Sequence, residues 1–461
     1  MIDLTALVAR QRQYFLSGAT RGVGFRLEQL RRLKEGIEAH EEELLAALHT
    51  DLRKPATEAY TSEIGVVLSE IAFAMKHLPK WMRADKRGLP VFAKPGRAWT
   101  VREPRGVALI IGPWNFPVQL LLAPLVGAIA AGNCACLKTP EHAPRSSAVI
   151  AKLIGAIFPP EYICAVEGHR DIAEALIRLK WDHIFFTGSA PVGRAVMHAA
   201  AENLTPVTLE LGGKCPCLVC DDATPAVAAR RILWGKFINA GQACVAPDFV
   251  LADKRISARL VEEMTKAARK FYGDDPKKSP DFGRIIDRRH FDRLTAFLGD
   301  GEIAMGGQHD AAELYIAPTI LTGVKRNAPV MQEEIFGPVL PVLEYENPGE
   351  ALEFLRGLPS PLALYVFTNK KDLQQRIVAE TRSGSVCIND TVLQISAKNL
   401  PFGGLGESGF GSYHGRAGFD CFSHERAILL RPEAFDPSGR YPPSETTLKD
   451  LKRFYRFMIN E

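Results

Sequence analysis

Short apolar runs alternate with helical patterns between residues 107 and 211, and this alternation limits the possible folds more than any other feature. The runs, rich in branched side chains, cover 107–111, 134–138, 162–166, 183–187 and 206–211. Helical patterns occupy 117–131, 145–157, 171–180 and 191–202. Strands that alternate with helices of this length need right-handed crossovers, which give a parallel sheet covered on both faces. We therefore predict an α/β fold with a nucleotide-binding domain.

The flanking segments carry other patterns. Apolar residues at helical spacing within 26–54 predict two amphipathic helices, while prolines and glycines in 81–102 favour a hairpin or arm. After residue 212 we expect a second α/β domain. Its helices are predicted at 226–238 and 256–271, and its strands at 339–343 and 364–367. From Leu400 the chain is glycine-rich, and it ends in a proline-rich connector and a short basic amphipathic segment.

Size, charge and cysteine content narrow the class of protein. A chain of 461 residues is long enough for about two to three domains. Its net charge of +4 is small for that length and gives no indication of nucleic-acid or membrane binding. Nine cysteines and an opening without a secretory signal favour reduced thiols in the cytoplasm. The most apolar stretch, 120–132, contains Pro124 and is too short to span a bilayer, so we expect a buried helix.

Two glycine-containing motifs raise the question of a nucleotide site. Gly188-Ser189 ends a strand and leads into a helix, where backbone N–H groups could hold a pyrophosphate, although a plain βα turn has the same composition. Gly404, Gly406 and Gly409 form GxGxxG without the strand and long helix of a dinucleotide fingerprint. We interpret this second motif as a flexible loop.

One cysteine differs from the others in its surroundings. Cys244 lies in NAGQACVAP, where small neighbours leave room for a substrate carbon and glycine lets backbone N–H groups point inward. An inert buried thiol is the alternative. The cysteines at 215, 217 and 220 follow a strand pattern and lack a second ligand pair, so we predict no metal site.

Two further polar residues follow predicted strands. Glu210 comes before Gly-Gly at the end of a strand, where open α/β sheets bind ligands, and it could act as a base or cap the turn. Asn115 follows the first strand of the sheet, and its side-chain amide could donate to an oxyanion or brace the loop. Both alternatives stay open at this point.

Taken in order, the motifs resemble the aldehyde dehydrogenase family over about residues 20–430. They are GPWNFP, PLVGAIAAGN, the Lys138 segment, FFTGS, LELGGK, GQACVAPD, QEEIFGPVLP and PFGGLGESGFGSYHG. GQACVAPD and the late YHG resemble the class 3 branch, which includes medium-chain aliphatic, aromatic, fatty and coniferyl aldehyde dehydrogenase-like enzymes. The apolar C-terminal tail of membrane-attached members has no counterpart here, so we expect a soluble enzyme without a membrane anchor.

The resemblance implies a domain arrangement. A non-standard Rossmann cofactor domain, which lacks the usual glycine fingerprint, would be formed by 1–80 and 103–210. An α/β catalytic domain would follow at 211–410. A small β oligomerisation arm would be formed by 81–102 and 416–435, with a tail at 436–461. We expect a homodimer, because the chain lacks the longer N-terminal region of tetrameric relatives.

The resemblance also implies the roles of individual residues. Cys244 would be the nucleophile, Glu210 the general base and Asn115 an oxyanion donor. The cofactor-binding positions would be Trp114, Lys138, Glu141, Gly188, Ser189, Val192, Glu334 and Phe336. The substrate pocket would include Phe116, Trp234, Phe402 and His414. The cofactor would be NAD or NADP, because Glu141 near a ribose would repel a 2′-phosphate while class 3 relatives often accept both.

Together these residues imply oxidation of an aldehyde to a carboxylic acid through a thioester on Cys244. A thiolate needs stabilisation, for which we expect a cationic nicotinamide and a helix N-terminus. Two alternatives are an acylating reductase, which uses coenzyme A or an acyl phosphate, and an inactive homologue that keeps the fold as a binding or structural protein. Glu210 argues for water as the acyl acceptor, and the presence of all three residues argues for activity.

Overall fold

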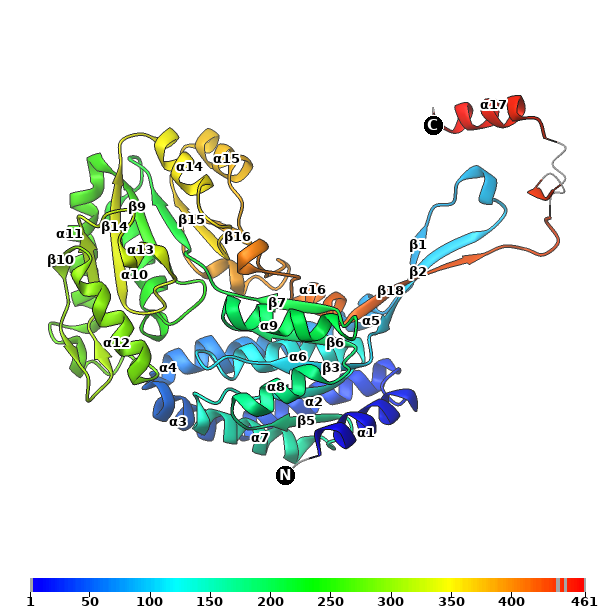
Figure 1. Cartoon of the computed structure of the whole chain (residues 1–461), viewed down its shortest axis with the longest axis horizontal. Coiled ribbons are helices and arrows are strands. Elements are labelled where there is room, and N and C mark those ends of the chain that lie inside the picture. The colour runs from blue at the N-terminus through cyan, green and yellow to red at the C-terminus, as the bar shows by residue number, and fades with distance from the viewer. Residues whose placement is uncertain (1–2, 437–439, 443–445, 460–461) are drawn as a thin grey trace. The chain divides into compact units, whose positions relative to one another are not determined.

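Figure 1 shows the computed structural model, which describes residues 3–436, 440–442 and 446–459. The chain divides into two compact units. Unit 1 contains Met1–Trp81 and Pro104–His424, and unit 2 contains Met82–Glu103 and Glu425–Glu461. Both large sheets belong to unit 1.

The first large sheet has six strands in the order β17-β7-β6-β3-β4-β5. Five of them are parallel and confirm the predicted strands: β3 (Val107–Ile111), β4 (Cys134–Lys138), β5 (Ile163–Val166), β6 (His183–Thr187) and β7 (Val207–Glu210). Strands β3, β4 and β6 are buried throughout, as expected for a sheet covered on both faces. Asn115, Ser189 and Glu210 lie at or just after the carboxyl ends of these strands, so parallel pairing brings them to one edge of the sheet.

The helices of this region largely match the predicted ones. They are α1 (Leu4–Leu16), α2 (Val23–Ala39), α3 (Glu41–Leu52), α4 (Ala56–Ala59), α5 (Gly65–Trp81), α6 (Gln119–Ala131), α7 (Pro144–Ile157), α8 (Arg170–Arg178), α9 (Ala190–Ala201) and α16 (Gly415–Cys421), with a π-helix at Tyr60–Ile64. Helix α6 is buried along its whole length, which confirms the buried helix expected around Pro124. The sequence analysis predicted neither α1 nor α5. Helix α1 buries only Leu7, Val8 and Gln11 and therefore has a weak apolar period.

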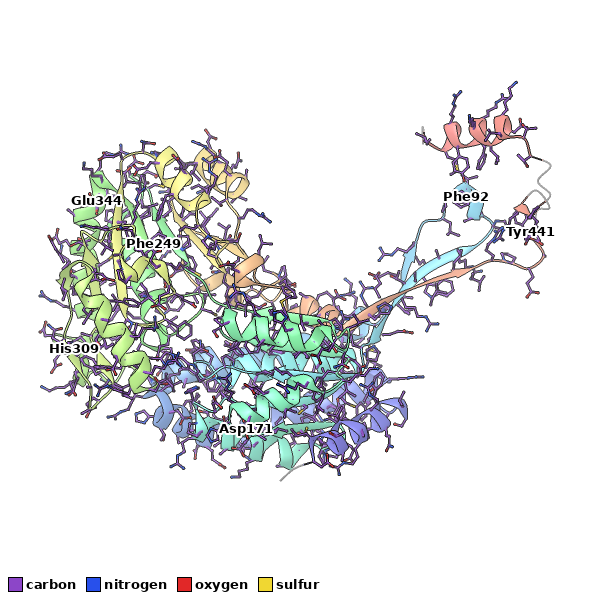
Figure 2. The ribbon with its side chains drawn as sticks, viewed as in Figure 1. Phe92, Asp171, Phe249, His309, Glu344 and Tyr441 are labelled. Atoms are coloured by element: carbon purple, nitrogen blue, oxygen red, sulfur yellow. The ribbon has the colours of Figure 1, made fainter. Side chains whose placement is uncertain are left out.

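The second large sheet has seven strands in the order β10-β13-β14-β9-β8-β15-β16, with β10 antiparallel to its neighbour. The strands are β8 (Pro216–Val219), β9 (Phe249–Asp253), β10 (Glu302–Met305), β13 (Thr319–Thr322), β14 (Val339–Tyr345), β15 (Ala363–Phe367) and β16 (Ser385–Ile388). The other elements are α10 (Pro225–Phe237), α11 (Lys254–Tyr272), α12 (Arg288–Ala296), α13 (Pro329–Gln332), α14 (Pro348–Arg356), α15 (Lys371–Glu380), β11 (His309–Asp310) and β12 (Tyr315–Ile316). Phe249 in β9, labelled in Figure 2, is fully buried and packs edge-on against Phe354 of α14. The predicted second α/β pattern is therefore confirmed.

Unit 2 contains most of a small sheet and a C-terminal helix. The sheet order is β1 (Asp85–Arg87), β2 (Arg97–Pro104) and β18 (Ser423–Leu430), and helix α17 (Leu448–Ile459) follows. Antiparallel pairing of β1 with β2 confirms the predicted hairpin. The predicted arm segment 416–435 begins too early, because α16 packs against α5 and α6 within unit 1. Phe419 of α16 is buried there beside Trp81, with ring centroids 5.7 Å apart.

The glycine-rich segment around residues 404–409 has a defined place in the first sheet, which corrects the prediction of a flexible loop. Gly406–Ser408 forms a short 3-10 turn, and β17 (Gly409–Phe410) pairs antiparallel with β7. A Cβ atom at Gly409 would lie 2.0 Å from the Leu209 carbonyl oxygen, so the close approach requires glycine. A two-residue strand has no period, and the sequence pattern could not reveal it.

Three further findings concern membranes, metals and thiols. None of the helices in the described ranges has both the length and the apolar character that crossing a membrane requires. Within the same ranges, no cluster of three or more His, Cys, Asp or Glu side chains is arranged to hold a metal ion. All nine cysteines are free thiols.

Candidate active site

Cys244 follows a tightly turned loop that joins α10 to β9. Asn239 and Ala240 both have left-handed backbones, with φ of 51° and 52°, and Gly241 continues the turn at φ 79°. A Cβ atom at Gly241 would lie 2.2 Å from the Gly337 carbonyl oxygen, so this position needs glycine. The strained turn directs the chain so that Cys244 lines a pocket.

The protein's own groups favour the thiol form of Cys244. Burial raises its pKa, and the carboxylates of Glu334 and Glu210 raise it further. The backbone N–H groups of Cys244 and Val245 act in the opposite direction. No helix begins at this position in the described chain, so the expected helix N-terminus is absent and a turn takes its place.

Asn115 lies in the loop between β3 and α6, close to the Cys244 loop. Its side-chain Nδ2 donates to the Gln242 carbonyl oxygen at 3.1 Å. Its own carbonyl oxygen accepts from Lys54 Nζ at 3.0 Å and from Asn239 Nδ2 at 2.8 Å. The two loops are therefore joined by reciprocal hydrogen bonds, and the Asn115 amide is held beside the segment that carries the thiol.

A buried ion pair supports the Asn115 loop from below. Lys54 Nζ and Glu63 Oε1 lie 2.5 Å apart, and both side chains are fully buried. Glu63 Oε2 accepts from the backbone N–H groups of Val118 and Gln119 at 2.9 and 3.1 Å. The Lys54 ammonium also lies 4.1 Å from the ring centroid of Phe116. Sequence reasoning did not identify this pair, because lysine and glutamate are almost never fully buried unless they are paired.

Glu210 ends strand β7 and has a different environment. Its side chain is 2% exposed, and neither carboxylate oxygen has a hydrogen-bond partner in the described structure. Burial raises its pKa well above the usual value for glutamate. A carboxylate with a raised pKa and no bound donor is well suited to accept a proton near neutral pH.

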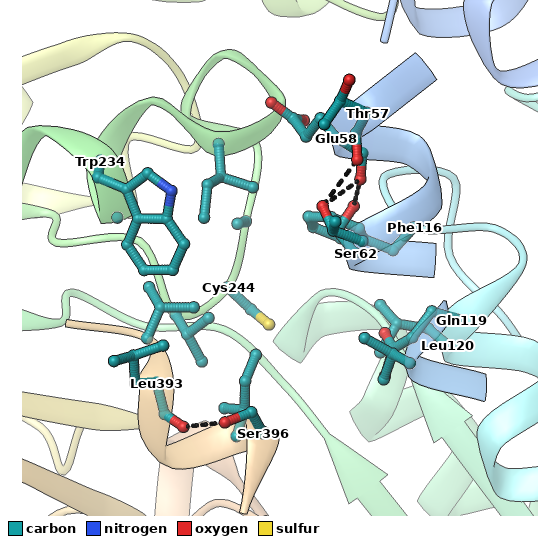
Figure 3. A pocket seen from close by; sticks show the side chains of 18 of the residues that line it. Thr57, Glu58, Ser62, Phe116, Gln119, Leu120, Trp234, Cys244, Leu393 and Ser396 are labelled. Atoms are coloured by element: carbon teal, nitrogen blue, oxygen red, sulfur yellow. Dashed lines mark hydrogen bonds between the residues drawn. The ribbon is translucent and has the colours of Figure 1, made fainter. Parts of the chain in front are cut away.

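Figure 3 shows the pocket, which has a volume of about 470 Å³. The Cys244 sulfur points into the space between the walls that carry Trp234 and Leu120. All four predicted pocket residues, Phe116, Trp234, Phe402 and His414, line it. Much of the remaining wall is apolar and includes Val66, Leu120, Ile238, Val245, Phe271, Val392, Leu393 and Ile395. Asn115 and Glu210 are not among the lining residues.

His414 has an ionic environment that the sequence did not reveal. Its Nδ1 lies 3.6 Å from Glu70 Oε2, and both side chains are buried. Lys398 Nζ lies 3.5 Å from the same carboxylate oxygen. The His414 ring also stacks on Tyr413, with centroids 4.3 Å apart. These contacts hold the imidazole at the pocket wall.

The predicted adenosine and pyrophosphate positions lie near the carboxyl edge of the first sheet. Ser189 is the N-cap of α9 but makes no side-chain capping bond, so the first turn of the helix is left for another acceptor. Val192, in that turn, is 50% exposed. Lys138 ends β4, and burial lowers its pKa. Glu141 follows β4, with its carboxylate 3.6 Å from His142.

The predicted nicotinamide positions meet the segment after Glu210. A Cβ atom at Gly212 would lie 2.0 Å from Glu334 Oε2, so glycine leaves the space that this carboxylate occupies. Burial raises the pKa of Glu334 to about 8. Phe336 makes an edge contact with Trp114, with ring centroids 5.4 Å apart. Glu334 is thus brought together with the first glycine of LELGG, and Phe336 with Trp114.

A second ion pair, between the partly buried Lys214 and the buried Asp248, connects three motifs that are far apart in the chain. Lys214 Nζ contacts Asp248 Oδ2 and donates to the Val330 and Glu333 carbonyl oxygens, both at 2.9 Å. Asp248 Oδ1 accepts from the Ile335 backbone N–H at 2.8 Å. The LELGGK, GQACVAPD and QEEIFGP segments therefore share one ionic centre, which fixes Glu334 relative to the Cys244 loop.

The chain is similar to known proteins in both sequence and fold. The aldehyde dehydrogenase family profile matches residues 3–428. The chain is 42% identical to 4,4'-diaponeurosporen-aldehyde dehydrogenase of Staphylococcus aureus, over 96% of this chain and 97% of that protein. It is 44% identical to the dimeric NADP-preferring aldehyde dehydrogenase of Canis lupus familiaris, over 96% and 98% of the two chains. A structure of the substrate-bound state of Staphylococcus aureus AldH matches with a TM-score of 0.96 and 41% identity, over 99% of this chain and 100% of that chain.

Proposed function

Because this chain belongs to the aldehyde dehydrogenase family and oxidises an aldehyde with NAD or NADP, we propose that Cys244, Asn115 and Glu210 carry out the reaction. The named relatives are dehydrogenases, which argues against the alternatives of an acylating reductase and an inactive homologue. The observation that carries the proposal is the Cys244 thiol in the pocket wall, joined through Gln242 to the Asn115 amide.

Cys244 would lose its S–H proton to solvent and attack the aldehyde carbon as a thiolate, which forms a C–S bond and places the negative charge on the former carbonyl oxygen. The second N–H of the Asn115 amide and the Cys244 backbone N–H would stabilise that oxyanion. Asn115 is suited to this task because its loop is held by Lys54, Asn239 and Gln242 before any substrate binds. The donor therefore needs little reorganisation when the charge develops.

Glu210 would act as the general base for hydrolysis of the thioester. It would take a proton from water, so that the hydroxyl adds to the acyl carbon and the Cys244 sulfur leaves as the carboxylic acid forms. The burial that raises its pKa makes it a stronger base than an exposed glutamate once it is ionised. In the part of the chain that the structure describes, no protein group donates to either Glu210 carboxylate oxygen, so both can accept a hydrogen bond from water.

The residues around the two sheet edges fit a nicotinamide dinucleotide. The chemistry that NAD or NADP supplies when bound is acceptance of a hydride from the aldehyde carbon. Gly188, Ser189 and Val192 would hold the pyrophosphate end, and Lys138 and Glu141 the adenine ribose. Glu334, Phe336 and Trp114 would hold the nicotinamide half. The uncapped first turn of α9 and the Glu334 carboxylate over Gly212 support this assignment.

The remaining wall residues would hold the aldehyde. Phe116, Trp234, Phe402 and His414 belong to a largely apolar pocket, which supports a hydrophobic aliphatic or aromatic aldehyde. A domain division at residue 211 follows from the same proposal, with the first sheet holding the cofactor and the second sheet carrying the Cys244 loop.

The first experiment compares wild type with Cys244→Ala and, as a matched control, Cys387→Ala. Cofactor reduction with aliphatic and aromatic aldehydes is followed by absorbance for NAD and for NADP. We expect turnover to disappear in the Cys244 variant and to persist in the Cys387 variant, because Cys387 lies in β16 rather than the Cys244 loop. Turnover that survives in Cys244→Ala contradicts the proposed nucleophile.

We also propose that the chain forms a homodimer in the cytoplasm. The dimeric canine relative supports the oligomeric state, since the chain covers 98% of that protein. The free thiols of all nine cysteines support a reducing compartment. Light scattering of the purified protein tests the dimer, and a monomeric mass at micromolar concentration contradicts it.

A further inference from the structure

The charged side chains in the pocket wall all carry the same sign. Among the described residues that line the pocket, Glu58 and Asp281 are acidic, and none is a lysine or an arginine. The wall also contains His414, whose imidazole already faces the Glu70 carboxylate. A ligand with a negative group away from its aldehyde therefore finds no lining lysine or arginine to pair with.

Glu58 is held in place at this wall. It lies in α4, next to the π-helix, and its Oε1 accepts from the Asn239 backbone N–H at 2.8 Å. Asn239 belongs to the left-handed turn that leads to Cys244. The carboxylate is therefore fixed relative to the thiol and cannot swing freely into solvent. Figure 3 shows Glu58 on the same helical wall as Thr57 and Ser62, apart from the Cys244 sulfur.

Two of the hydroxyl groups beside Glu58, those of Thr61 and Ser62, are already bonded to backbone carbonyl oxygens. Thr61 Oγ1 donates to the Thr57 carbonyl oxygen at 2.8 Å, and Ser62 Oγ donates to the Glu58 carbonyl oxygen at 2.6 Å. Lys54 is near Glu58, but its ammonium is bound to Glu63 and to the Asn115 carbonyl oxygen. The negative charge of Glu58 thus faces the pocket without a cation of its own.

We propose that Glu58 is a specificity-determining residue that selects aldehydes whose far end is uncharged and rejects those that carry a distal carboxylate. This inference rests on the proposed function, because it assumes that the aldehyde carbon meets Cys244 in this pocket. The physical cause is like-charge repulsion in a partly buried site, where water screens charges poorly. Specificity then comes from a repulsive contact in addition to the apolar lining.

The test uses matched pairs of substrates. Straight-chain aldehydes of increasing length are compared with their ω-carboxylate counterparts, and kcat/KM is measured for wild type, Glu58→Gln and Asp281→Asn. We expect Glu58→Gln to lower the preference for the uncharged aldehyde by on the order of tenfold, as removal of a nearby like charge predicts. Gln keeps an oxygen that can accept from the Asn239 N–H, so the fold is preserved. Asp281 is exposed, and its variant should change the preference less.

A pH series adds an independent check. Burial raises the pKa of Glu58 to about 7, while Lys54 and the Asn239 N–H oppose the shift and Glu63 and Asp281 add to it. Tyr272 faces the same carboxylate from α11. Discrimination against the ω-carboxylate substrate should therefore grow as pH rises through about 7 in wild type. It should be nearly constant in Glu58→Gln.

Binding separates this inference from the proposed mechanism. In Cys244→Ala protein, with and without Glu58→Gln, dissociation constants are measured by calorimetry for a monocarboxylic acid product and for the dicarboxylic acid of equal length. Weaker binding of the dicarboxylic acid, relieved by Glu58→Gln, supports the proposal even if turnover were lost for other reasons. An unchanged preference in both kinetics and binding overturns it. Turnover of uncharged aldehydes in Cys244→Ala overturns the proposed function instead.

Discussion

The Asn115 loop and Glu210 lie at the same edge of the first sheet, yet the protein treats their polar groups in opposite ways. Around Asn115 the carbonyl oxygen and the side-chain amide have protein partners, and a fully buried ion pair lies beneath the loop. Around Glu210 both carboxylate oxygens are buried without a partner. The difference fits the roles that we propose, because an oxyanion donor benefits from being immobile, while a base must keep its lone pairs free.

The largest expected effect comes from Glu210→Gln. Loss of the general base should slow steady-state turnover by roughly 100- to 10,000-fold, because thioester hydrolysis loses proton transfer. Acylation of Cys244 should persist, so a rapid burst of cofactor reduction should remain in stopped-flow measurements. An unchanged steady-state rate would show that Glu210 is not the base.

The same variant should be more stable than wild type at neutral pH. The pKa of Glu210 is raised in the folded state, so its stabilising contribution is present at low pH and is lost as pH rises through the folded-state value. Gln has no charge to bury. Urea unfolding should therefore give a higher midpoint for Glu210→Gln at pH 7, with a smaller difference near pH 4. A lower urea midpoint for Glu210→Gln than for wild type at pH 7 would contradict the conclusion that the Glu210 carboxylate is buried without a partner.

Lys54→Met should have the opposite effect on stability. It leaves Glu63 buried without its cation, which typically costs about 3–5 kcal/mol in free energy of unfolding. Turnover should fall as well, because the Asn115 carbonyl loses a donor. The double variant Lys54→Met with Glu63→Gln is the control. Its neutral amide oxygen can still accept from Val118 or Gln119, so it should recover part of the lost stability, and no recovery would argue against charge as the cause.

Asn115→Ala should reduce turnover by roughly 100- to 1,000-fold, the usual result of removing one oxyanion donor. In contrast to Glu210→Gln, the burst itself should slow, since the missing donor acts when the sulfur adds to the aldehyde. The free energy of unfolding should fall by about 1 kcal/mol through loss of the bond to Gln242. A normal burst followed by slow steady-state turnover would show that Asn115 acts in deacylation and not in the addition step.

The pH dependence should be smaller but diagnostic. Because Glu210 must be ionised to accept a proton and its pKa is raised, kcat should fall as pH decreases through that raised value, by about tenfold per unit. The decline should begin well above the range of an ordinary glutamate. Glu210→Gln should lack this acid limb, and its persistence there would assign the limb to another group.

The smallest effect is expected at an exposed ion pair. Lys34 and Glu38 lie one turn apart on α2, 3.4 Å between charged atoms, and both side chains are nearly half exposed. Glu38→Gln should change the free energy of unfolding by less than about 0.5 kcal/mol. A change as large as that of Lys54→Met would mean that burial does not distinguish the two pairs.

The sequence predicted the parallel strands and named Asn115, Glu210 and Cys244, but it did not identify Lys54, Glu63 or Gln242. Apolar periodicity is a property of neighbouring residues, so it was sufficient to predict strands β3 to β7. Burial of a lysine cannot be predicted from local sequence, because it depends on which distant segments pack against the connection between α3 and α4 that contains Lys54. The sequence shows that position 409 is a glycine, but it does not predict the close approach to the Leu209 carbonyl oxygen that requires one.

By itself, the sequence determined which chemical groups the protein has and in what order they come: a thiol among small residues, a carboxylate at a strand end and an amide after the first strand. These properties depend on side-chain chemistry and short-range spacing. Only the tertiary structure decided that the Asn115 amide meets Gln242, 127 positions away, that Lys54 is sealed under the loop, and that Glu58 faces the pocket. Such contacts arise when distant segments pack together, and packing sets burial, pKa and hydrogen-bond partners.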